Sequence, residues 1–300
     1  MPSNKKIACL IAGVALAALL SSCAASAATG GSDVMTSQSV AQPGGNAEKG
    51  AANVKKIVQP PAAAPFDYQL GGPYTPRKGV SVVERDRTAE PAQGLYNICY
   101  VNGFQTQPNE SKSFAKAHPN LVLQKGGKPL VDPGWPDEYI FDTSTQAKRV
   151  QLTNIVGSWI DGCAKSGYAA VEIDNLDSYT RSQRLLTAAD NLALAKAYAA
   201  AAHASGLAIA QKNTADLAPK LKALGYDFAV TESCFEFEEC SSYTDRYKAV
   251  YDIEYTDELG ESGFTDACTD PHRPATMILR DHNLVTPNSG DYVYRACAAK

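Results

Sequence analysis

The sequence predicts an α/β fold, and a single-domain (β/α)₈ TIM barrel fits it best. Short apolar runs of strand-like composition alternate with longer stretches of helical spacing, the pattern of parallel strands joined by helices. From Phe66 to the end the chain has 235 residues, close to the roughly 250 of a typical barrel. Acidic and amide side chains directly follow several apolar runs, where a barrel carries its catalytic groups.

The predicted strands are apolar runs too short for helices. They cover Leu95–Val101, Tyr168–Ile173, Leu207–Gln211, Phe228–Thr231, Ala249–Ile253 and Thr276–Leu279, and the weaker runs Val80–Val83 and Leu121–Leu123 bring the total to eight. Helices are predicted over Gln146–Lys165 and Ala188–Ala204, with Gly206 placed to cap the second. An open doubly wound sheet is the alternative, but it would need a glycine-rich turn after its first strand, and the sequence has none.

The first residues have the layout of an export signal. Lys5 and Lys6 precede an apolar stretch from Ile7 to Leu20, which is too short to span a bilayer. Leu20-Ser21-Ser22-Cys23 resembles a bacterial lipobox, so residues 1–23 are predicted to be a lipoprotein signal with a lipid on Cys23. Ordinary cleavage after Ala25-Ser26-Ala27 is the alternative. Either way we expect an exported protein, lipid-anchored at the bacterial surface or secreted.

Residues 24–65 are rich in Ala, Gly, Ser, Gln and Pro, so they are predicted to form a flexible linker before a catalytic domain over 66–300. Removing residues 1–23 takes away two lysines and no acids, which changes the net charge from −4 to −6. A negative domain argues against a nucleic-acid partner. Membrane contact is expected only through the lipid at Cys23.

Six cysteines remain after Cys9 and Cys23 are set aside, and an even number in an exported chain predicts disulfides. Cys234 with Cys240 is the expected local bridge and Cys268 with Cys297 the expected C-terminal one, which leaves Cys99 with Cys163 by elimination. There is no Cys-x-x-Cys pair or Cys/His cluster, so the sequence predicts no zinc site.

Polar residues at the strand ends form a candidate catalytic and substrate-binding set: Asn102, Asp174, Asn175, Asp177, Lys212, Asn213, Glu232, Glu254 and Asp281. Glycoside hydrolysis needs two carboxyl groups flanking the bond, and Asp174 and Glu232 lie two βα units apart, so they could face each other across a barrel mouth. A serine hydrolase would need a Gly-x-Ser-x-Gly elbow, which is absent. The segment from Asp174 to Asp177 begins like a calcium loop but lacks the glycine and the final glutamate of an EF-hand.

Six ordered motifs then carry a family resemblance. They read Cys99-Tyr100, Trp135-Pro136-Asp137-Glu138, Val171 through Tyr179, Lys212-Asn213, Glu232-Ser233-Cys234 and Glu254-Tyr255. From about Phe66 to Cys297 the chain resembles glycoside hydrolase family 114, the endo-α-1,4-polygalactosaminidases. The resemblance implies cleavage inside an α-1,4-linked, galactosamine-containing polysaccharide without a cofactor. It also implies that Asp174 is the nucleophile or base and Glu232 the general acid. The chain departs from the family at its first strand, where Phe66 to Gly72 contains no tryptophan.

Several residues keep two interpretations. Glu232 and Glu254 could each pair with Lys212 instead of contacting substrate, and Asp174 could be a helix N-cap. Trp135 and Tyr179 are predicted to bind substrate, yet aromatic residues at strand ends are as often core residues as sugar platforms. The acidic stretch from Gly225 to Asp270 could be a solvated face or could attract a cationic polymer. A non-catalytic glycan-binding protein, or a glycosidase for another amino sugar or an α-galactan, are the alternative functions.

Overall fold

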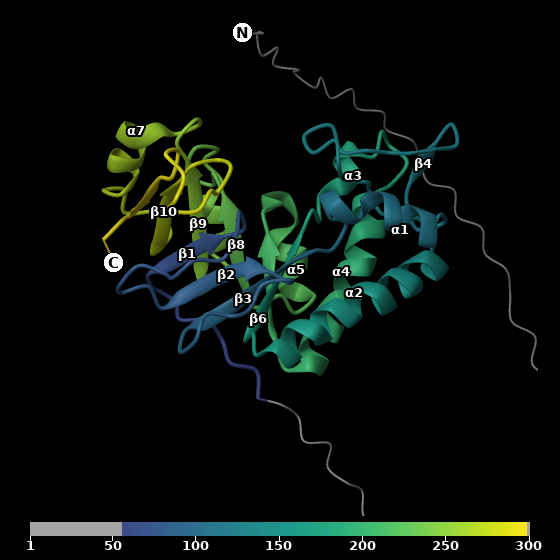
Figure 1. Ribbon diagram of the computed structural model, residues 1–300, viewed down its shortest axis with the longest axis horizontal. Helices are drawn as coiled ribbons and strands as arrows, with labels where there is room; N and C mark the ends of the chain where they lie inside the picture. Colours follow the sequence, from purple (N-terminus) through teal and green to yellow (C-terminus); the bar gives the residue numbers. More distant parts are fainter. Residues whose placement is uncertain (1–55, 299–300) are drawn as a thin grey trace, which may run out of the picture. The chain divides into compact units, whose positions relative to one another are not determined.

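Eight parallel strands curl into a barrel in the computed structural model, which describes residues 56–298 (Figure 1). In their order around the sheet, the strands are β1 (Phe66–Gln69), β2 (Val82–Asp86), β3 (Tyr96–Asn102), β6 (Ala170–Asp174), β7 (Ala208–Lys212), β8 (Phe228–Glu232), β9 (Val250–Tyr255) and β10 (Thr276–Arg280). A ninth strand, β11 (Tyr294–Ala296), runs antiparallel on the edge of β10. The predicted (β/α)₈ class is confirmed.

The barrel is closed between β10 and β1 by side chains, because no ladder joins these two strands in the described part of the sheet. Arg280 is fully buried, its guanidinium donates to the carbonyl oxygen of Tyr68, and it lies 3.7 Å from the carboxylate of Asp67. Nearer the start of β10, the Thr276 hydroxyl donates to the carbonyl oxygen of Ala64 at 3.1 Å. A buried guanidinium needs both a counter-ion and hydrogen-bond acceptors, and this seam provides both.

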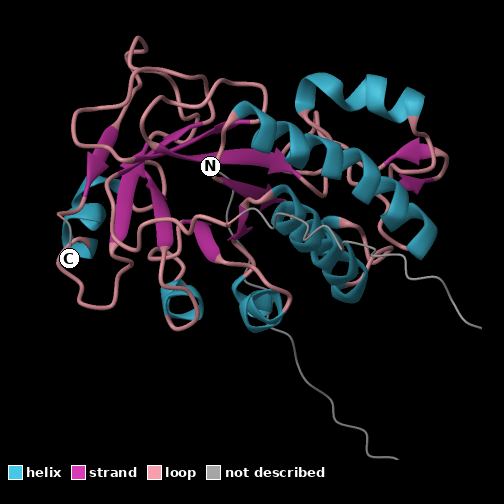
Figure 2. Cartoon of the chain, turned by 90° about the horizontal axis from the view of Figure 1, so that it is seen from below, coloured by secondary structure: helices cyan, strands magenta, loops and turns pink. Residues whose placement is uncertain are grey.

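Helices cover the outside of the strands (Figure 2). The two longest are α2 (Gln146–Ser166) and α4 (Ala188–Ser205), and the shorter ones are α1 (Ser111–Ala117), α3 (Ser178–Arg181), α5 (Ala218–Ala223), α6 (Cys240–Thr244) and α7 (Gly260–Ala267). Two 3₁₀ turns, η1 (Pro108–Glu110) and η2 (Ala215–Leu217), and a hairpin of β4 (Gln124–Lys125) and β5 (Lys128–Pro129) complete the described elements. Both predicted helices are confirmed, and α4 ends at Gly206, whose φ of 82° is the left-handed cap that the sequence predicted.

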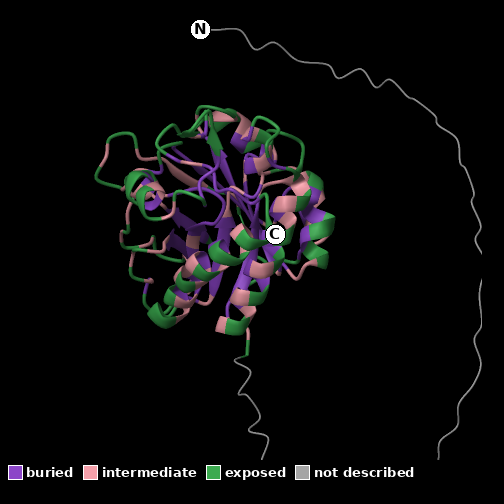
Figure 3. Ribbon diagram, turned by 90° about the vertical axis from the view of Figure 1, so that its right-hand side faces the viewer, coloured by how far each residue is buried: buried purple, intermediate pink, exposed green. Residues whose placement is uncertain are grey.

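The strand side chains alternate between two cores. Phe66, Ile98, Ala210 and Ile253 belong to the inward cluster that fills the barrel, whereas Val171 and Ile209 belong to the outward cluster under the helices. Figure 3 shows the buried residues concentrated in the strands and on the sheet-facing sides of the helices. Because side chains in a strand alternate with period two, the parity of a residue decides whether it points into the barrel.

The predicted strand Leu121–Leu123 is wrong. Val122 makes only an isolated antiparallel bridge to Phe141 in the long connection between β3 and β6. Leu121 and Val122 pack into the large core cluster under the helices and Leu123 into a smaller one, so the run is apolar because it is buried and not because it pairs in the sheet. The eighth barrel strand is instead β1, whose polar Asp67 and Gln69 are buried and make its sequence unlike an apolar run.

Residues 56–65, which the sequence assigned to the linker, lie across the N-terminal ends of the strands. The Tyr96 hydroxyl donates to the carbonyl oxygen of Val58 at 2.8 Å, and the Tyr251 hydroxyl donates to that of Pro61 at 2.6 Å. This segment therefore covers the end of the barrel opposite the strand ends that carry the candidate site. The predicted signal, Cys23 and residues 24–55 lie outside the described residues. In the part described, no helix is both long and apolar enough to cross a membrane.

The three expected disulfides are present. Cys99–Cys163 joins β3 to α2, Cys234–Cys240 closes the loop after β8, and Cys268–Cys297 ties the end of α7 to the C-terminal segment. Cys99–Cys163 fixes a helix to the sheet, and the other two bridges fix segments outside the strands. A disulfide typically stabilises a fold by about 2–4 kcal/mol.

A substitution at Gly103 can test how tightly the core is packed at the end of β3. A methyl group there would clash with Cγ2 of Ile173 and lie 3.3 Å from the Tyr198 ring. We expect Gly103→Ala to lower the free energy of unfolding by about 1–3 kcal/mol because the core is already full. Gly162→Ala is the control, since Gly162 is exposed within α2 with open space around it, and it should stabilise by about 0.5–1 kcal/mol. Equal chemical-denaturation midpoints for the two variants would contradict this account.

Candidate active site

A cavity of about 760 Å³ opens at the C-terminal ends of the barrel strands. Its wall includes Tyr100 from β3, Asp174 from β6, Lys212 from β7, Glu232 from β8 and Tyr255 from β9. The carboxyl ends of parallel barrel strands meet at one edge, which is why residues far apart in sequence come together here.

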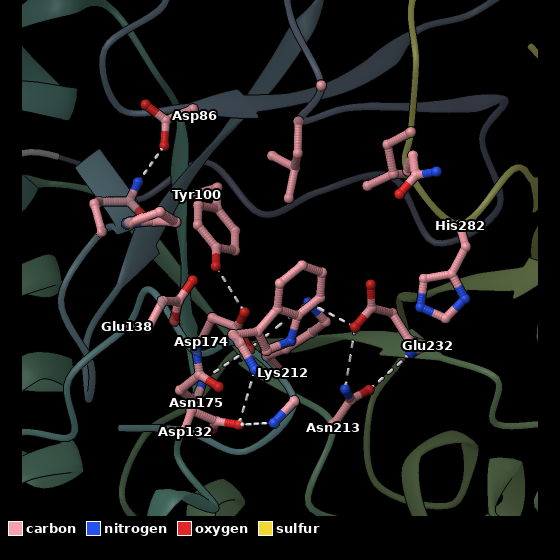
Figure 4. A pocket seen from close by; sticks show the side chains of 18 of the residues that line it. Asp86, Tyr100, Asp132, Glu138, Asp174, Asn175, Lys212, Asn213, Glu232 and His282 are labelled. Atoms are coloured by element: carbon pink, nitrogen blue, oxygen red, sulfur yellow. Dashed lines mark hydrogen bonds and ion pairs between the residues drawn. The ribbon is translucent and has the colours of Figure 1, made fainter. Parts of the chain in front are cut away.

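The ammonium group of Lys212 lies between the two candidate catalytic carboxylates (Figure 4). Its Nζ is 3.7 Å from Oδ1 of Asp174 and 3.3 Å from Oε2 of Glu232. Nζ also donates to the Tyr68 hydroxyl at 2.9 Å and to Oε1 of Glu172 at 3.2 Å. Burial disfavours the charge of Lys212, but the carboxylates around it outweigh burial and raise its pKa well above the usual value, so the cation persists.

Asp174 is held by two further donors. The Tyr100 hydroxyl donates to Oδ2 at 2.8 Å, and the backbone N–H of Asn175 donates to Oδ1 at 2.7 Å. Burial and the charge of Asp174 raise the pKa of Tyr100, so the phenol keeps its proton and acts as a donor. Asp174 is thus fixed in position with one face toward the cavity.

Glu232 has its own set of donors on the opposite wall. The Tyr255 hydroxyl donates to Oε1, and the Asn213 side-chain amide donates to Oε2 at 3.4 Å. The Asn213 Oδ1 in turn accepts from the backbone N–H of Glu232 at 2.7 Å, which fixes the orientation of the amide. Burial and the charge of Glu232 raise the pKa of Tyr255, so this phenol also remains a donor.

Sharp turns follow the strands that carry these groups. Asn175, Asn213 and Ser233 each come directly after a strand and have φ values of 62°, 45° and 58°. Left-handed backbone is tolerated by asparagine and is strained for serine. Three consecutive barrel strands therefore end in the same way, each with its functional side chain as the last residue before the turn.

Two further glutamates lie below Lys212 inside the barrel. Glu172 and Glu84 are both fully buried and point inward from β6 and β2. Burial, followed by the charge of Glu172, raises the pKa of Glu84 far above its usual value, so the Glu84 carboxyl group keeps its proton. Burial also raises the pKa of Glu172, to about 7, against the opposing effect of Lys212. A proton on Glu84 limits the negative charge buried around one ammonium group.

A polar network extends from Asp174 along one wall. The Asn102 amide donates to Oε2 of Glu138 at 2.8 Å, and Asn102 Oδ1 accepts from the Asn175 side chain at 3.0 Å. The Arg181 guanidinium donates to Oδ1 of Asn175 at 2.8 Å and pairs with Asp177 at 2.7 Å. The predicted residues Asn102, Asn175 and Asp177 are therefore joined, with Asn102 behind the wall and the other two in it.

Trp135 also lines the cavity and is 57% exposed, which leaves its ring available to a ligand. Three other predicted substrate-binding residues do not line it. Tyr179 packs against the core, and Asp281 accepts hydrogen bonds from the backbone N–H groups of Val285 and Val293 in the loop after β10.

Glu254 is the third. It points outward from β9, where its carboxyl accepts from the backbone N–H of Phe235 at 2.8 Å. Tyr255, one residue later, has the opposite parity and faces the cavity instead. The alternation of strand side chains explains why the Glu-Tyr motif contributes its tyrosine to the site.

In the described residues, potential metal ligands gather at one place, formed by Cys234, Cys240 and Asp252. The two sulfur atoms are bonded to each other in a disulfide, so they do not supply the thiolates that a metal would need. This group does not fit a metal ion.

The sequence profile of glycoside-hydrolase family GH114 matches residues 47–300. The chain belongs to family GH114. No curated protein sequence matches this GH114 member. Its fold resembles a crystal structure of Aspergillus fumigatus Ega3 in complex with galactosamine, with a TM-score of 0.63 and 22% identity over 77% of this chain and 96% of Ega3. It also resembles a single-residue variant of the glycoside hydrolase domain of PelA from Pseudomonas aeruginosa, with a TM-score of 0.53 and 14% identity over 78% of this chain and 98% of that domain. At these identities the likeness shows a shared fold.

Sequence reasoning missed several groups of the GH114 site. Tyr68, Tyr100 and Tyr255 bind Lys212 or a carboxylate, and Glu138 and Arg181 complete the wall beside Asp174. Tyr100, Glu138 and Tyr255 stood inside the recognised motifs, so strand parity applied to those motifs could have identified the tyrosines. Arg181 had no sequence signal.

The outward position of Glu254 predicts a pH effect on stability. Burial, followed by the charge of Asp252, raises the pKa of Glu254 to about 10. Unfolded glutamate titrates near pH 4.3, so between about pH 4.3 and 10 the folded state binds the extra proton and loses stability as the pH rises. Glu254→Gln removes this loss, because an amide does not titrate. We expect the melting temperature of the variant minus that of the wild type to be larger at pH 9 than at pH 5. Equal differences at the two pH values would contradict the raised pKa of Glu254.

Proposed function

We propose that this GH114 protein hydrolyses internal α-1,4 bonds of a galactosamine-containing polysaccharide with Asp174 and Glu232 as its carboxyl pair. The observation that carries the proposal is that both carboxylates contact one buried ammonium group at the mouth of the barrel. Family membership supports glycoside hydrolysis, and the Ega3 crystal structure contains galactosamine.

In the proposed reaction Glu232 gives a proton to the leaving glycosidic oxygen while Asp174 acts on the anomeric carbon or on a water molecule. Tyr100 orients Asp174, and Tyr255 and Asn213 orient Glu232. Lys212 stays charged beside both carboxylates and offsets the negative charge that moves between them.

The spacing of the pair favours retention of configuration. Oδ1 of Asp174 and Oε2 of Glu232 contact the same nitrogen at 3.7 and 3.3 Å, so these two oxygens lie no more than 7.0 Å apart. Retaining enzymes place their carboxyl groups about 5–5.5 Å apart and inverting ones about 6.5–9.5 Å apart. The 7.0 Å bound contains the whole retaining range and only the lower edge of the inverting one. We therefore expect the first product seen by proton NMR to keep the α configuration, and an initial β product would contradict the nucleophilic role of Asp174.

Loss of either carboxylate should separate hydrolysis from binding. We expect Asp174→Asn and Glu232→Gln each to lower kcat on galactosaminogalactan by at least about 10²–10⁴-fold while oligosaccharide binding persists. Product analysis by mass spectrometry, with calorimetric binding in parallel, measures both. Exposed Glu261→Gln in α7 is the matched control and should behave like the wild type. If the wild type releases no product but binds the polymer, the protein is a glycan-binding member of the family instead.

The charge of the cavity favours a cationic polymer. Eight acidic residues line the cavity, whereas the permanently charged basic residues in its lining are Arg181 and Lys212. A galactosamine chain with free amino groups carries ammonium charges, which this field would attract. We expect KM for the deacetylated polymer to rise several-fold between 50 and 500 mM salt, since the screening length falls from roughly 10 Å near 0.1 M toward 3 Å at 1 M. A KM independent of salt would contradict electrostatic attraction of the substrate.

We also propose that the mature protein is exported and carries a lipid on Cys23. Three disulfides support an oxidising location. Mass spectrometry of the N-terminal peptide from cells would find a diacylglyceryl group on Cys23 if this is right, and a free Ala28 N-terminus if simple secretion occurs.

A further inference from the structure

Glu138 stands in the cavity wall beside Asp174, on the long connection between β3 and β6 (Figure 4). Its side chain is well buried, and the residue is only 7% exposed. Oε2 accepts the hydrogen bond from Asn102, whereas no described group donates to Oε1. Because Glu138 lines the cavity, this second oxygen is the one available to a ligand.

The direction of this carboxylate is fixed by its support. Asn102 Oδ1 accepts from the Asn175 side chain and from the backbone N–H of Gln105 at 3.2 Å, so the amide must present its NH₂ to Glu138. Asn175 is itself held by Arg181. Preorganised partners of this kind are typical of a binding group and reduce the entropy lost when a ligand binds.

Glu138 differs from its acidic neighbours in having no cation. Arg181 pairs with both Asp132 and Asp177, and Lys212 pairs with Asp174. Among the described residues no lysine, arginine or histidine forms an ion pair with Glu138. Burial, with added repulsion from Asp174 and Asp132, raises the pKa of Glu138 to about 7. The hydrogen bond from Asn102 and the charge of Arg181 oppose this rise only in part, and a cation entering the cavity would oppose it further.

We propose that Glu138 is a specificity-determining residue that binds the ammonium group of the sugar unit lying next to Asp174, and so selects free amino sugars over N-acetylated ones. An ammonium group supplies the missing charge and up to three donors, whereas an acetamido group is neutral and offers a single N–H. The assignment rests on the proposed carbohydrate substrate but not on the hydrolytic step.

Sugar binding tests the assignment without requiring turnover. Calorimetric or NMR titrations would compare galactosamine, galactose and N-acetylgalactosamine on the full domain. The wild type should prefer galactosamine, and Glu138→Gln should reduce that preference by about 10- to 100-fold, the range of a charged hydrogen bond. Binding of galactose should change little. Glu261→Gln, which also removes one negative charge but lies outside the cavity, should keep the preference.

A purely structural role for Glu138 would weaken all three sugars together, and this result would overturn the proposal. So would a wild type that does not distinguish galactosamine from galactose. Glu138→Asp guards against misfolding, because it keeps the charge on a shorter side chain and should retain part of the preference. If the wild type shows the Glu138-dependent preference but cleaves no polymer, the subsite stands and the proposed hydrolysis fails.

Discussion

One buried ammonium group organises the centre of this barrel. Lys212 is 2% exposed and contacts Glu172, Asp174, Glu232 and the Tyr68 hydroxyl. An unpaired ammonium inside a barrel would be costly, and so would the carboxylates without it. Each charge is therefore tolerable only because the others are present. This mutual dependence fixes the two candidate catalytic groups relative to each other.

The same requirement explains other polar residues in the barrel. Glu84 keeps its proton because it is fully buried and lies near the charge of Glu172, and the charge of Lys212 opposes these effects only in part. At the seam between β10 and β1, Arg280 pairs with Asp67 and donates to a backbone carbonyl, so a charged interaction joins two strands between which the described residues form no ladder. The barrel interior is thus apolar at one end, and it contains a network of ion pairs toward its mouth.

Much of the fold was predictable because it depends on local patterns. Apolar runs marked seven of the eight barrel strands, helical spacing marked α2 and α4, and Gly206 marked the end of α4. The failures have a common physical cause. Leu121–Leu123 is apolar because it covers the core, and β1 contains buried polar residues, so in both cases composition reflects tertiary burial and not pairing.

The site was predictable in part for the same reason. Residues at strand ends must meet at one edge of a parallel barrel, which brought Asp174, Lys212 and Glu232 together as expected. Glu254 and Asp281 also follow strands but do not reach the cavity, since one points outward and the other binds the loop after β10. Glu138 comes from a connection, and its position beside Asp174 could not be obtained from strand order.

By itself, the sequence determined the barrel class, the three cysteine pairs and the strands that carry the chemistry, because these depend on periodicity, spacing and ordered motifs. The tertiary structure alone decided which polar side chains face one another, which carboxyl groups share a cation and which one lacks it. Those properties depend on distances of a few ångströms between residues that can be more than two hundred positions apart, as for Tyr68 and Arg280, whose separation in sequence is 212. Hydrogen bonding and ion pairing act over such distances in space, and the order of residues along the chain does not encode them directly.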